Sequence, residues 1–139
     1  MELYVDANVF ISYIKQELGG MYTIQFPRVK ELYIKCRDEG HIFILSPKTF
    51  EEVEKNGYTS EEELTEFLDD YGIRYRKVNH TPEIKEKSGK IKKERGIHYP
   101  DCLHAAYALH YSADCIITWD TDFQPIKGLI EVKTPFEFL

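Results

Sequence analysis

The sequence predicts an α/β protein, a three-layer α/β/α sandwich around a mainly parallel, twisted sheet of about five strands. The runs 42–46 and 115–118 are apolar without alternation, as expected for strands buried on both faces. Helical patterns separate the short strands, and this alternation is typical of a parallel sheet. With 139 residues, of which 42% are hydrophobic, the chain is expected to form a single domain over 1–139.

The first half of the chain contains two expected strands and four expected helices. A short strand at 2–5 precedes a helix at 8–17, which places its apolar residues on one side. Pro27 is expected at the first position of a second helix that runs to Gly40. After the strand 42–46 we expect helices at 47–56, ending at Gly57, and from Ser60 to Tyr71, where Ser60 and Glu63 make a capping box.

The second half continues the pattern. Residues 73–78 alternate and predict a strand, and Thr81–Pro82–Glu83 has the cap, proline and acid of a helix start, although Ser88–Gly89 should weaken that helix. Pro100 is expected to be the first residue of the next helix, which would make Asp101 the second. The run 115–118 predicts a buried strand, and 129–133 an edge strand.

Acidic side chains stand next to the carboxyl ends of these strands, where ligands bind in parallel sheets. Asp6 follows the first strand, Glu52 lies on the helix after 42–46, and Asp120 and Asp122 follow 115–118. Asp101 begins the helix that leads into that last strand and should reach the same edge. Each acid also has an ordinary explanation, since Asp6 could cap a helix, Glu52 could be solvated and Asp120 could form a turn.

The motif "HYPDCLHAAYALH" (98–110) also contains cysteine and histidine, which raises the alternative of a zinc site. His98, Cys102 and His104 lack the paired spacing of tetrahedral zinc ligands, and Cys102 and His104 should point to different faces of the helix. We therefore expect these histidines and this cysteine to take no part in the site. The small residues Ala105 and Ala108 behind Asp101 indicate close packing there, where a buried charge needs a compensating cation.

Oxygen ligands without paired Cys or His favour a hard cation, Mg²⁺ or Mn²⁺. We expect Asp6, Glu52, Asp101 and Asp120 to hold it, with Asp122 as a further or alternative ligand. One or two such ions would relieve repulsion among the carboxylates, lower the pKa of a water molecule and clamp the oxygens of a phosphoryl group during in-line displacement.

The charge distribution suggests a polyanionic partner. The net charge is −6, but residues 74–95 hold nine Lys/Arg and three Glu, a local charge of +6. Such a basic segment beside a cation site could hold a phosphate backbone, or it could be a solvated helix face. The candidate RNA-binding residues are seven of these cations: Arg74, Arg76, Lys87, Lys90, Lys92, Lys93 and Arg95.

The cellular setting follows from composition. Three cysteines without CxxC spacing fit a reducing cytoplasm rather than a disulfide framework. The N-terminus lacks the basic region and cleavage site of a signal peptide, and no apolar stretch is long enough to span a membrane. We expect a cytoplasmic protein without membrane contact.

Four motifs in order resemble those of the PIN domain family, the nuclease fold that includes VapC-type toxins. "YVDANVFI" resembles the first motif, "LSPKTFEEV" the second, "YPDCLHAAYAL" the third and "ADCIITWDTDF" the fourth, and "VKTPFEFL" resembles the C-terminal tail. The resemblance assigns the four acids to Asp6, Glu52, Asp101 and Asp120, and gives Asn8 and Thr118 supporting polar roles. Two departures are Ala7, where many toxins have Thr or Ser, and residues 74–99, which match no motif.

The resemblance implies a metal-dependent endoribonuclease that cleaves single-stranded RNA, usually as a homodimer, and in toxin members an antitoxin partner. Two alternatives remain open at this stage. One is an inactive RNA-binding module of the same fold, since fold does not guarantee activity. The other is a haloacid-dehalogenase-type phosphatase, suggested by "DANVF", although that chemistry needs an acid where Asn8 stands.

Overall fold

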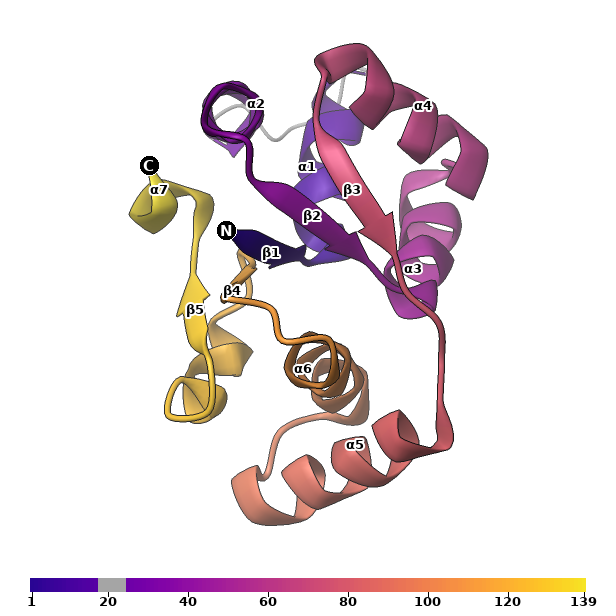
Figure 1. The fold of residues 1–139 in the computed structure, drawn as a ribbon, viewed down its shortest axis with the longest axis vertical. Coiled ribbons are helices and arrows are strands. Elements are labelled where there is room, and N and C mark those ends of the chain that lie inside the picture. Colours follow the sequence, from indigo (N-terminus) through magenta and orange to yellow (C-terminus); the bar gives the residue numbers. More distant parts are fainter. Residues whose placement is uncertain (18–24) are drawn as a thin grey trace.

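An entirely parallel five-stranded sheet forms the centre of the protein (Figure 1). The computed structural model describes residues 1–17 and 25–139. The strands lie in the order β3-β2-β1-β4-β5, and each neighbouring pair is parallel. They are β1 (Glu2–Val5), β2 (Ile42–Leu45), β3 (Arg74–Lys77), β4 (Cys115–Ile117) and β5 (Glu131–Lys133). The predicted fold class is confirmed.

Helices cover both faces of the sheet and make the outer two layers (Figure 1). The helices are α1 (Ala7–Glu17), α2 (Gln25–Glu39), α3 (Pro47–Gly57), α4 (Glu61–Tyr71), α5 (Pro82–Arg95), α6 (Tyr99–His110), the 3-10 helix η1 (Thr121–Ile126) and α7 (Pro135–Phe138). The first four pack on one face, whereas α5 and α6 pack on the other. Within the described ranges, no helix is both long and apolar enough to cross a membrane.

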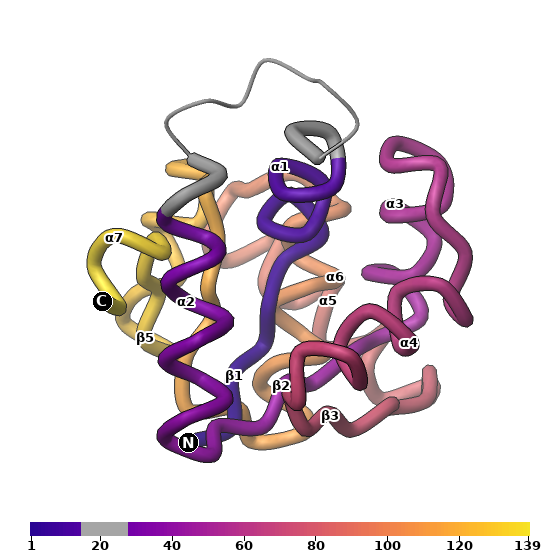
Figure 2. The backbone as a smooth tube through the Cα atoms, turned by 90° about the horizontal axis from the view of Figure 1, so that it is seen from above, coloured from indigo at the N-terminus to yellow at the C-terminus, as the bar shows by residue number. Residues whose placement is uncertain are grey.

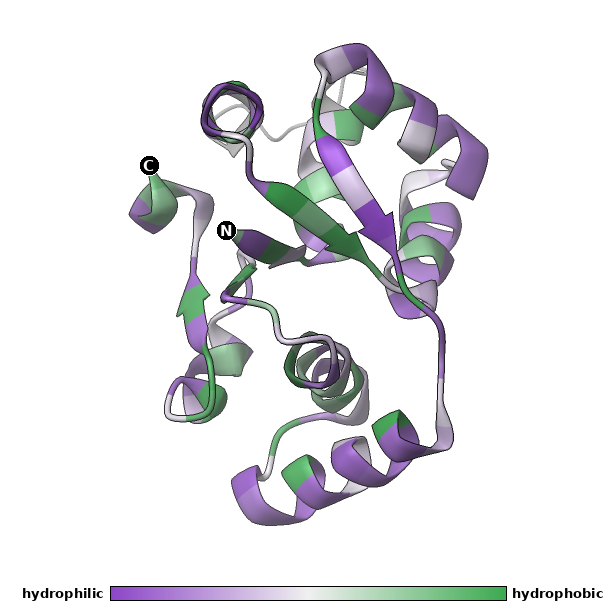
Figure 3. Cartoon of the chain, in the orientation of Figure 1, coloured by the Kyte–Doolittle hydropathy of each residue, from purple (hydrophilic) through white to green (hydrophobic). Residues whose placement is uncertain are grey.

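Alternating residues of the central strands fill two separate cores. Leu3 and Val5 of β1 point into the core beneath α1 to α4, whereas Tyr4 between them points into the core beneath α5 and α6. Figure 3 shows the difference between the hydrophobic β2 and the hydrophilic edge strand β3. Charged residues on an exposed edge such as Arg74–Lys77 oppose pairing with another chain.

The helix boundaries follow the expected caps closely but not everywhere. Ser60 and Glu63 form the predicted capping box of α4, and Gly40 and Gly72 take positive φ angles, +73° and +75°, after their helices. The second helix begins at Gln25, so Pro27 is not its first residue.

In the second half of the chain, α5 runs without interruption through Ser88–Gly89. Ser88 is buried, and a side chain at Gly89 would meet nothing within 4 Å. The next helix, α6, begins at Tyr99, so Asp101 is its third residue rather than its second.

The carboxyl ends of the strands share one edge of the sheet. β1 runs from the N-terminus directly into α1 (Figure 2). The backbone N–H of Asp6 donates to the carbonyl of Ile117 at the end of β4 (2.9 Å), and the β1–β4 register pairs Val5 with Ile117. The residues that follow β1 and β4 therefore lie side by side.

Candidate metal centre

Asp6 is fixed at the edge of the sheet by its neighbour across the sheet. It is buried, and its Oδ2 accepts a hydrogen bond from the Thr118 hydroxyl (2.7 Å). Thr118 Oγ1 also accepts bonds from the Asp120 backbone N–H (3.0 Å) and from the Asn8 side-chain amide (3.2 Å). Asn8 Oδ1 in turn accepts the N–H of Trp119 (3.2 Å). Asn8 and Thr118 thus join the ends of β1 and β4 and leave Asp6 Oδ1 facing the site.

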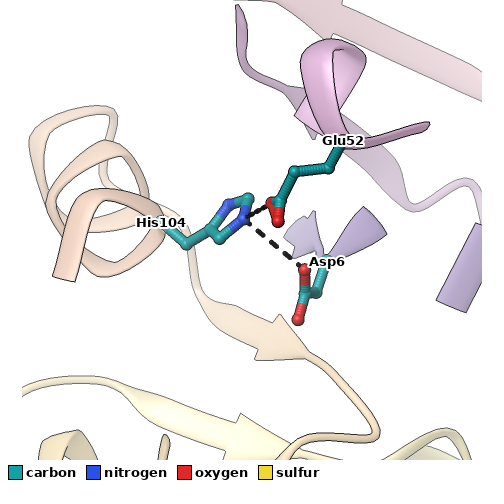
Figure 4. Close-up of side chains that lie close together, drawn as sticks. All are labelled: Asp6, Glu52 and His104. Atoms are coloured by element: carbon teal, nitrogen blue, oxygen red, sulfur yellow. Dashed lines mark hydrogen bonds and ion pairs between the residues drawn. The ribbon is translucent and has the colours of Figure 1, made fainter. Parts of the chain in front are cut away.

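Glu52 reaches the same place from α3, and the residue it meets is His104 (Figure 4). His104 Nε2 makes a hydrogen bond to Glu52 Oε1 and lies 3.6 Å from Asp6 Oδ1. The adjacent Glu51 instead pairs with Lys48 on the exposed side of α3 (3.4 Å). Of the two neighbouring glutamates, only Glu52 is directed at Asp6.

The expectation that His104 takes no part in the site is therefore wrong. His104 is buried and belongs to α6, one turn after Asp101. Residues three apart share a helix face, so this spacing could have placed His104 beside the acids. The lack of paired cysteine or histidine spacing argues against tetrahedral zinc, but a histidine that bonds carboxylates needs no such partner.

Asp101, Asp120 and Asp122 form the adjacent group of acids, with one carboxylate oxygen of each within 4.8 Å of the others. Asp120 precedes η1 and caps it, since its Oδ1 accepts the backbone N–H of Asp122 (2.8 Å). The charge of Asp120 acts on both Asp6 and Asp101. The charge of Asp122 acts on Asp101 from a more exposed position, and the two groups are linked through the charges of Asp120 and Asp6.

Burial and mutual repulsion disturb the protonation of these groups. Burial raises the pKa of Asp6, and the charges of Glu52 and Asp120 add to the rise, while His104 and Thr118 oppose it. The pKa of Asp101 rises to about 6, mainly through burial and the charges of Asp120 and Asp6.

The ion pair between His104 and Glu52 shifts both partners toward their charged forms. Burial alone would raise the pKa of Glu52, but its hydrogen bond to His104 and the charge of that residue lower it overall. Burial alone would likewise lower the pKa of His104, but Asp6 and Glu52 outweigh burial and raise it.

The donor set fits a divalent cation. Two groups of close ligand atoms, Asp6–Glu52–His104 and Asp101–Asp120–Asp122, come from four separate segments of the chain. Carboxylates that raise each other's pKa are stabilised by a cation between them, and oxygen ligands suit Mg²⁺ or Mn²⁺. The structure thus places Asp6 and Glu52 in one group and Asp101, Asp120 and Asp122 in another at the carboxyl ends of the strands. That they bind metal together stays a prediction.

The cysteines do not form a zinc site in the described part of the chain. Cys102 Sγ points to the carbonyl of Ile97 (3.4 Å), and Cys36, Cys102 and Cys115 are all buried free thiols. Neither group of close ligand atoms found among the described residues contains a cysteine. The cysteines therefore serve as small core residues.

The basic segment 74–95 is divided between two ends of the protein. Arg74 donates to the carbonyl of Gly40 (3.0 Å) and Arg76 pairs with Glu2 (2.9 Å), so both are held at or toward the amino ends of the strands, away from the acids. The end of α5 lies nearer to the acids, because Arg95 donates to the carbonyl of Pro125 in η1 (3.3 Å), the 3-10 helix that contains Asp122. Lys87, Lys90, Lys92 and Lys93 are on the same helix, and all but the partly buried Lys87 are exposed.

A cavity of about 310 Å³ lies beside the acids, between the end of α5 and η1. Its lining residues are Gly96, Ile97, His98, Thr121, Asp122 and Pro125. Space of this kind next to Asp122 lets a ligand approach the carboxylates from solvent.

Comparison with known proteins agrees with the fold. The family model of the PIN domain matches residues 3–129. A search of curated proteins found no match.

Three solved structures share the fold over nearly their whole length. One is a toxin-antitoxin complex from Klebsiella pneumoniae, with 22% identity, a TM-score of 0.63 and 99% of each chain covered. VapBC2 from Rickettsia felis, bound to a promoter DNA fragment, has 14% identity, a TM-score of 0.64 and coverage of 96% of this chain and 98% of that one. VapBC-1 from nontypeable Haemophilus influenzae has 20% identity, a TM-score of 0.62 and coverage of 98% and 99%.

Proposed function

Because this chain belongs to the PIN domain family, we propose that it is a divalent-metal-dependent endoribonuclease that hydrolyses phosphodiester bonds of single-stranded RNA. The observation that supports the proposal is the gathering of acids from four separate segments at the carboxyl edge of the sheet, Asp6 and Glu52 in one group and Asp101 and Asp120 in another whose charges act on each other. These four are the proposed catalytic residues, and Asp122 is a further ligand. We take 1–139 to be one catalytic domain.

The four acids are proposed to act in two pairs. Asp6 and Glu52 would hold Mg²⁺ or Mn²⁺ on one side, and Asp101 and Asp120 on the other. The cation supplies charge neutralisation at the phosphate and activation of a water molecule. Thr118 occupies Asp6 Oδ2 and leaves Oδ1 for the cation. The pKa of Asp101, raised to about 6 by burial and by neighbouring carboxylates, would fall when a cation neutralises those charges, so that Asp101 would bind in its ionised form.

The phosphate chain of RNA would approach along the end of α5. Lys92, Lys93 and Arg95 stand on that part of the helix, whose last residue bonds to η1 next to Asp122. The cavity of about 310 Å³ beside Asp122 would take the part of the strand that lies next to the acids. Arg74 and Arg76, at the other end of the sheet, are not part of this path.

The partners we propose are an antitoxin protein and a second copy of the chain. The similar structures are described as toxin-antitoxin and VapBC complexes, and the chain is matched to them over 96% or more of its length. We expect expression in a bacterial cytoplasm to arrest growth, and the Asp6→Asn variant to be harmless. Light scattering of the purified protein would report a homodimer.

The decisive experiment compares neighbouring glutamates on α3 together with the two aspartates. Purified protein with Mn²⁺ should cleave single-stranded RNA, while Asp6→Asn, Asp101→Asn and Glu52→Gln should be inactive. Glu51→Gln is the matched control, because Glu51 is exposed and pairs with Lys48. Undiminished cleavage by both aspartate variants would refute the proposal, and binding of RNA without cleavage by the unmodified protein would favour the inactive RNA-binding module.

The phosphatase alternative requires an acid-base group at position 8. The Asn8 amide instead donates to the Thr118 hydroxyl and accepts from the Trp119 backbone N–H. It joins the ends of β1 and β4 and offers no acid-base group. A phosphatase of this type would form a phospho-enzyme at Asp6, which mass spectrometry after incubation with a phosphate ester would detect.

A further inference from the structure

A chain of buried polar side chains extends from the metal centre into the second core. It begins at Glu52, passes through His104 and Tyr4, and ends at Ser46 and Thr49. Tyr4 and His104 are 0% and 1% exposed. Burying polar groups at this depth costs free energy unless they form hydrogen bonds. The unbroken series of hydrogen bonds therefore offsets the cost of burying these side chains.

The protonation of the His104 ring nitrogen that faces the acids follows from its hydrogen-bond partners. His104 Nε2 faces Glu52 Oε1 and Asp6 Oδ1. A carboxylate can only accept, so Nε2 carries a proton and donates it. On the other side of the ring, Nδ1 lies 2.5 Å from the Tyr4 hydroxyl, and that hydroxyl is also bonded to Ser46 Oγ (2.7 Å). Both nitrogens of the imidazole are thereby held, and the ring has no freedom to rotate.

Glu52 depends on this ring for its direction. Glu51 and Glu52 are neighbours on α3, yet the Glu51 side chain is 65% exposed and that of Glu52 only 25%. Consecutive residues of a helix point to different faces, and on its own face the Glu52 carboxylate bonds the imidazole of His104, whereas Glu51 pairs with Lys48. A glutamate side chain without such a bond gains rotamer freedom in solvent, so loss of the imidazole would release the Glu52 carboxylate from Asp6.

We propose that His104 is a positioning residue, whose Nε2–H holds the Glu52 carboxylate beside Asp6 while Tyr4 holds the imidazole from behind. The proposal rests on the proposed function only in that Asp6 and Glu52 bind a divalent cation. His104 itself is not a ligand. It bonds one oxygen of Glu52 and leaves the other free, as hydrogen bonds to ligating carboxylates generally do.

The test is the affinity for Mn²⁺, measured by titration calorimetry on the full chain. His104→Leu removes the donor and should weaken Mn²⁺ binding about 10- to 100-fold, the usual effect of losing such a partner. His104→Gln keeps an N–H near the position of Nε2 and should retain most of the affinity. Tyr4→Phe keeps the ring but frees Nδ1, and should give an intermediate loss.

The matched control is His80→Leu. His80 Nδ1 also bonds a tyrosine hydroxyl, that of Tyr107 (3.0 Å), but its other nitrogen bonds no carboxylate of the described residues. The Mn²⁺ affinity of this variant should equal that of the unmodified protein. Should His104→Leu fail to fold, Tyr4→Phe and His104→Gln still decide the matter, since equal affinity in Tyr4→Phe together with a full loss in His104→Gln would contradict the proposal.

Pulsed electron paramagnetic resonance of bound Mn²⁺ separates positioning from ligation. We expect no coupling to a directly bound ¹⁴N nucleus. A ¹⁴N coupling that disappears in His104→Leu would make His104 a ligand and overturn the proposal. Unchanged Mn²⁺ affinity in His104→Leu would also overturn it while the proposed function stands, whereas no binding of millimolar Mn²⁺ by the unmodified protein would overturn both.

Discussion

Replacement of Asp101 with Asn should stabilise the metal-free protein and at the same time remove its stabilisation by Mn²⁺. The pKa of Asp101 rises from 3.8 to about 6. At about 1.36 kcal/mol per pKa unit, the rise corresponds to about 3 kcal/mol of unfavourable free energy. Solvent screening at this partly exposed carboxylate reduces that cost to about 1 kcal/mol. Asn carries no charge and avoids it, so the melting temperature should increase by about 3 °C.

The pH dependence of this difference has a definite sign. A carboxyl group whose pKa is raised by folding carries its cost only when it is ionised. The stability advantage of Asp101→Asn should therefore be complete well above pH 6, shrink as the pH falls through about 6, and vanish below 3.8, where the group is protonated in both the folded and unfolded protein.

Mn²⁺ should reverse the order of stability. At a concentration of 100 times its Kd, a ligand of the native state adds about 2.7 kcal/mol, which the unmodified protein gains and Asp101→Asn largely does not. Thermal unfolding with EDTA or MnCl₂ at about pH 7.5, well above the raised pKa of Asp101, measures both effects. An Asn variant that is less stable in EDTA, or that gains as much from Mn²⁺ as the unmodified protein, would refute the reasoning.

Glu83→Gln is the matched control for Asp101→Asn. Glu83 follows Pro82 in the first turn of α5, as Asp101 follows Pro100 in α6. Its pKa is lowered, chiefly by the backbone N–H at the start of the helix. Neutralising it should therefore give no stabilisation in EDTA, and the response to Mn²⁺ should remain complete.

Three further variants test other parts of the molecule. Thr118→Val keeps the side-chain volume but removes the donor to Asp6, so it should cost about 1–3 kcal/mol of unfolding free energy and weaken Mn²⁺ binding, as urea titration and calorimetry would show. Ser60→Ala breaks the capping box of α4 and should cost about 1 kcal/mol in urea titration without altering RNA cleavage. Replacing Lys92 and Lys93 with Gln should reduce the salt slope of single-stranded RNA binding by about 0.7 for each phosphate that is no longer neutralised, measured by fluorescence anisotropy. An unchanged slope would mean that α5 is a solvated face.

The local features of the fold were predictable because they depend on residues close in the chain. The capping box at Ser60 and Glu63 and the apolar strand 42–46 each carry their own structural signal, and both formed as expected. The misplaced helix starts near Pro27 and Pro100 have a local cause too. Proline is compatible with any position of the first helical turn, so it indicates a helix start only to within one or two residues.

The candidate acids were also predictable in part, because strand ends in a parallel sheet meet at one edge. That rule placed Asp6, Asp101 and Asp120 together without any knowledge of their contacts. The same rule said nothing of the basic residues. Arg74 begins the edge strand β3, and Arg76 pairs with Glu2 at the start of β1, whereas Arg95 reaches η1. A positive segment in sequence is thus divided in space.

The amino-acid sequence by itself determined the α/β class, the helix caps and the edge on which the carboxylates gather, since periodicity, capping and strand polarity act over short distances. Only the tertiary structure decided which side chains touch. Tyr4 and His104 are 100 positions apart, and Glu52 lies 52 positions before His104. Their contact depends on how α3 and α6 pack against the sheet, which makes a histidine that looked incidental the residue holding Glu52 beside Asp6.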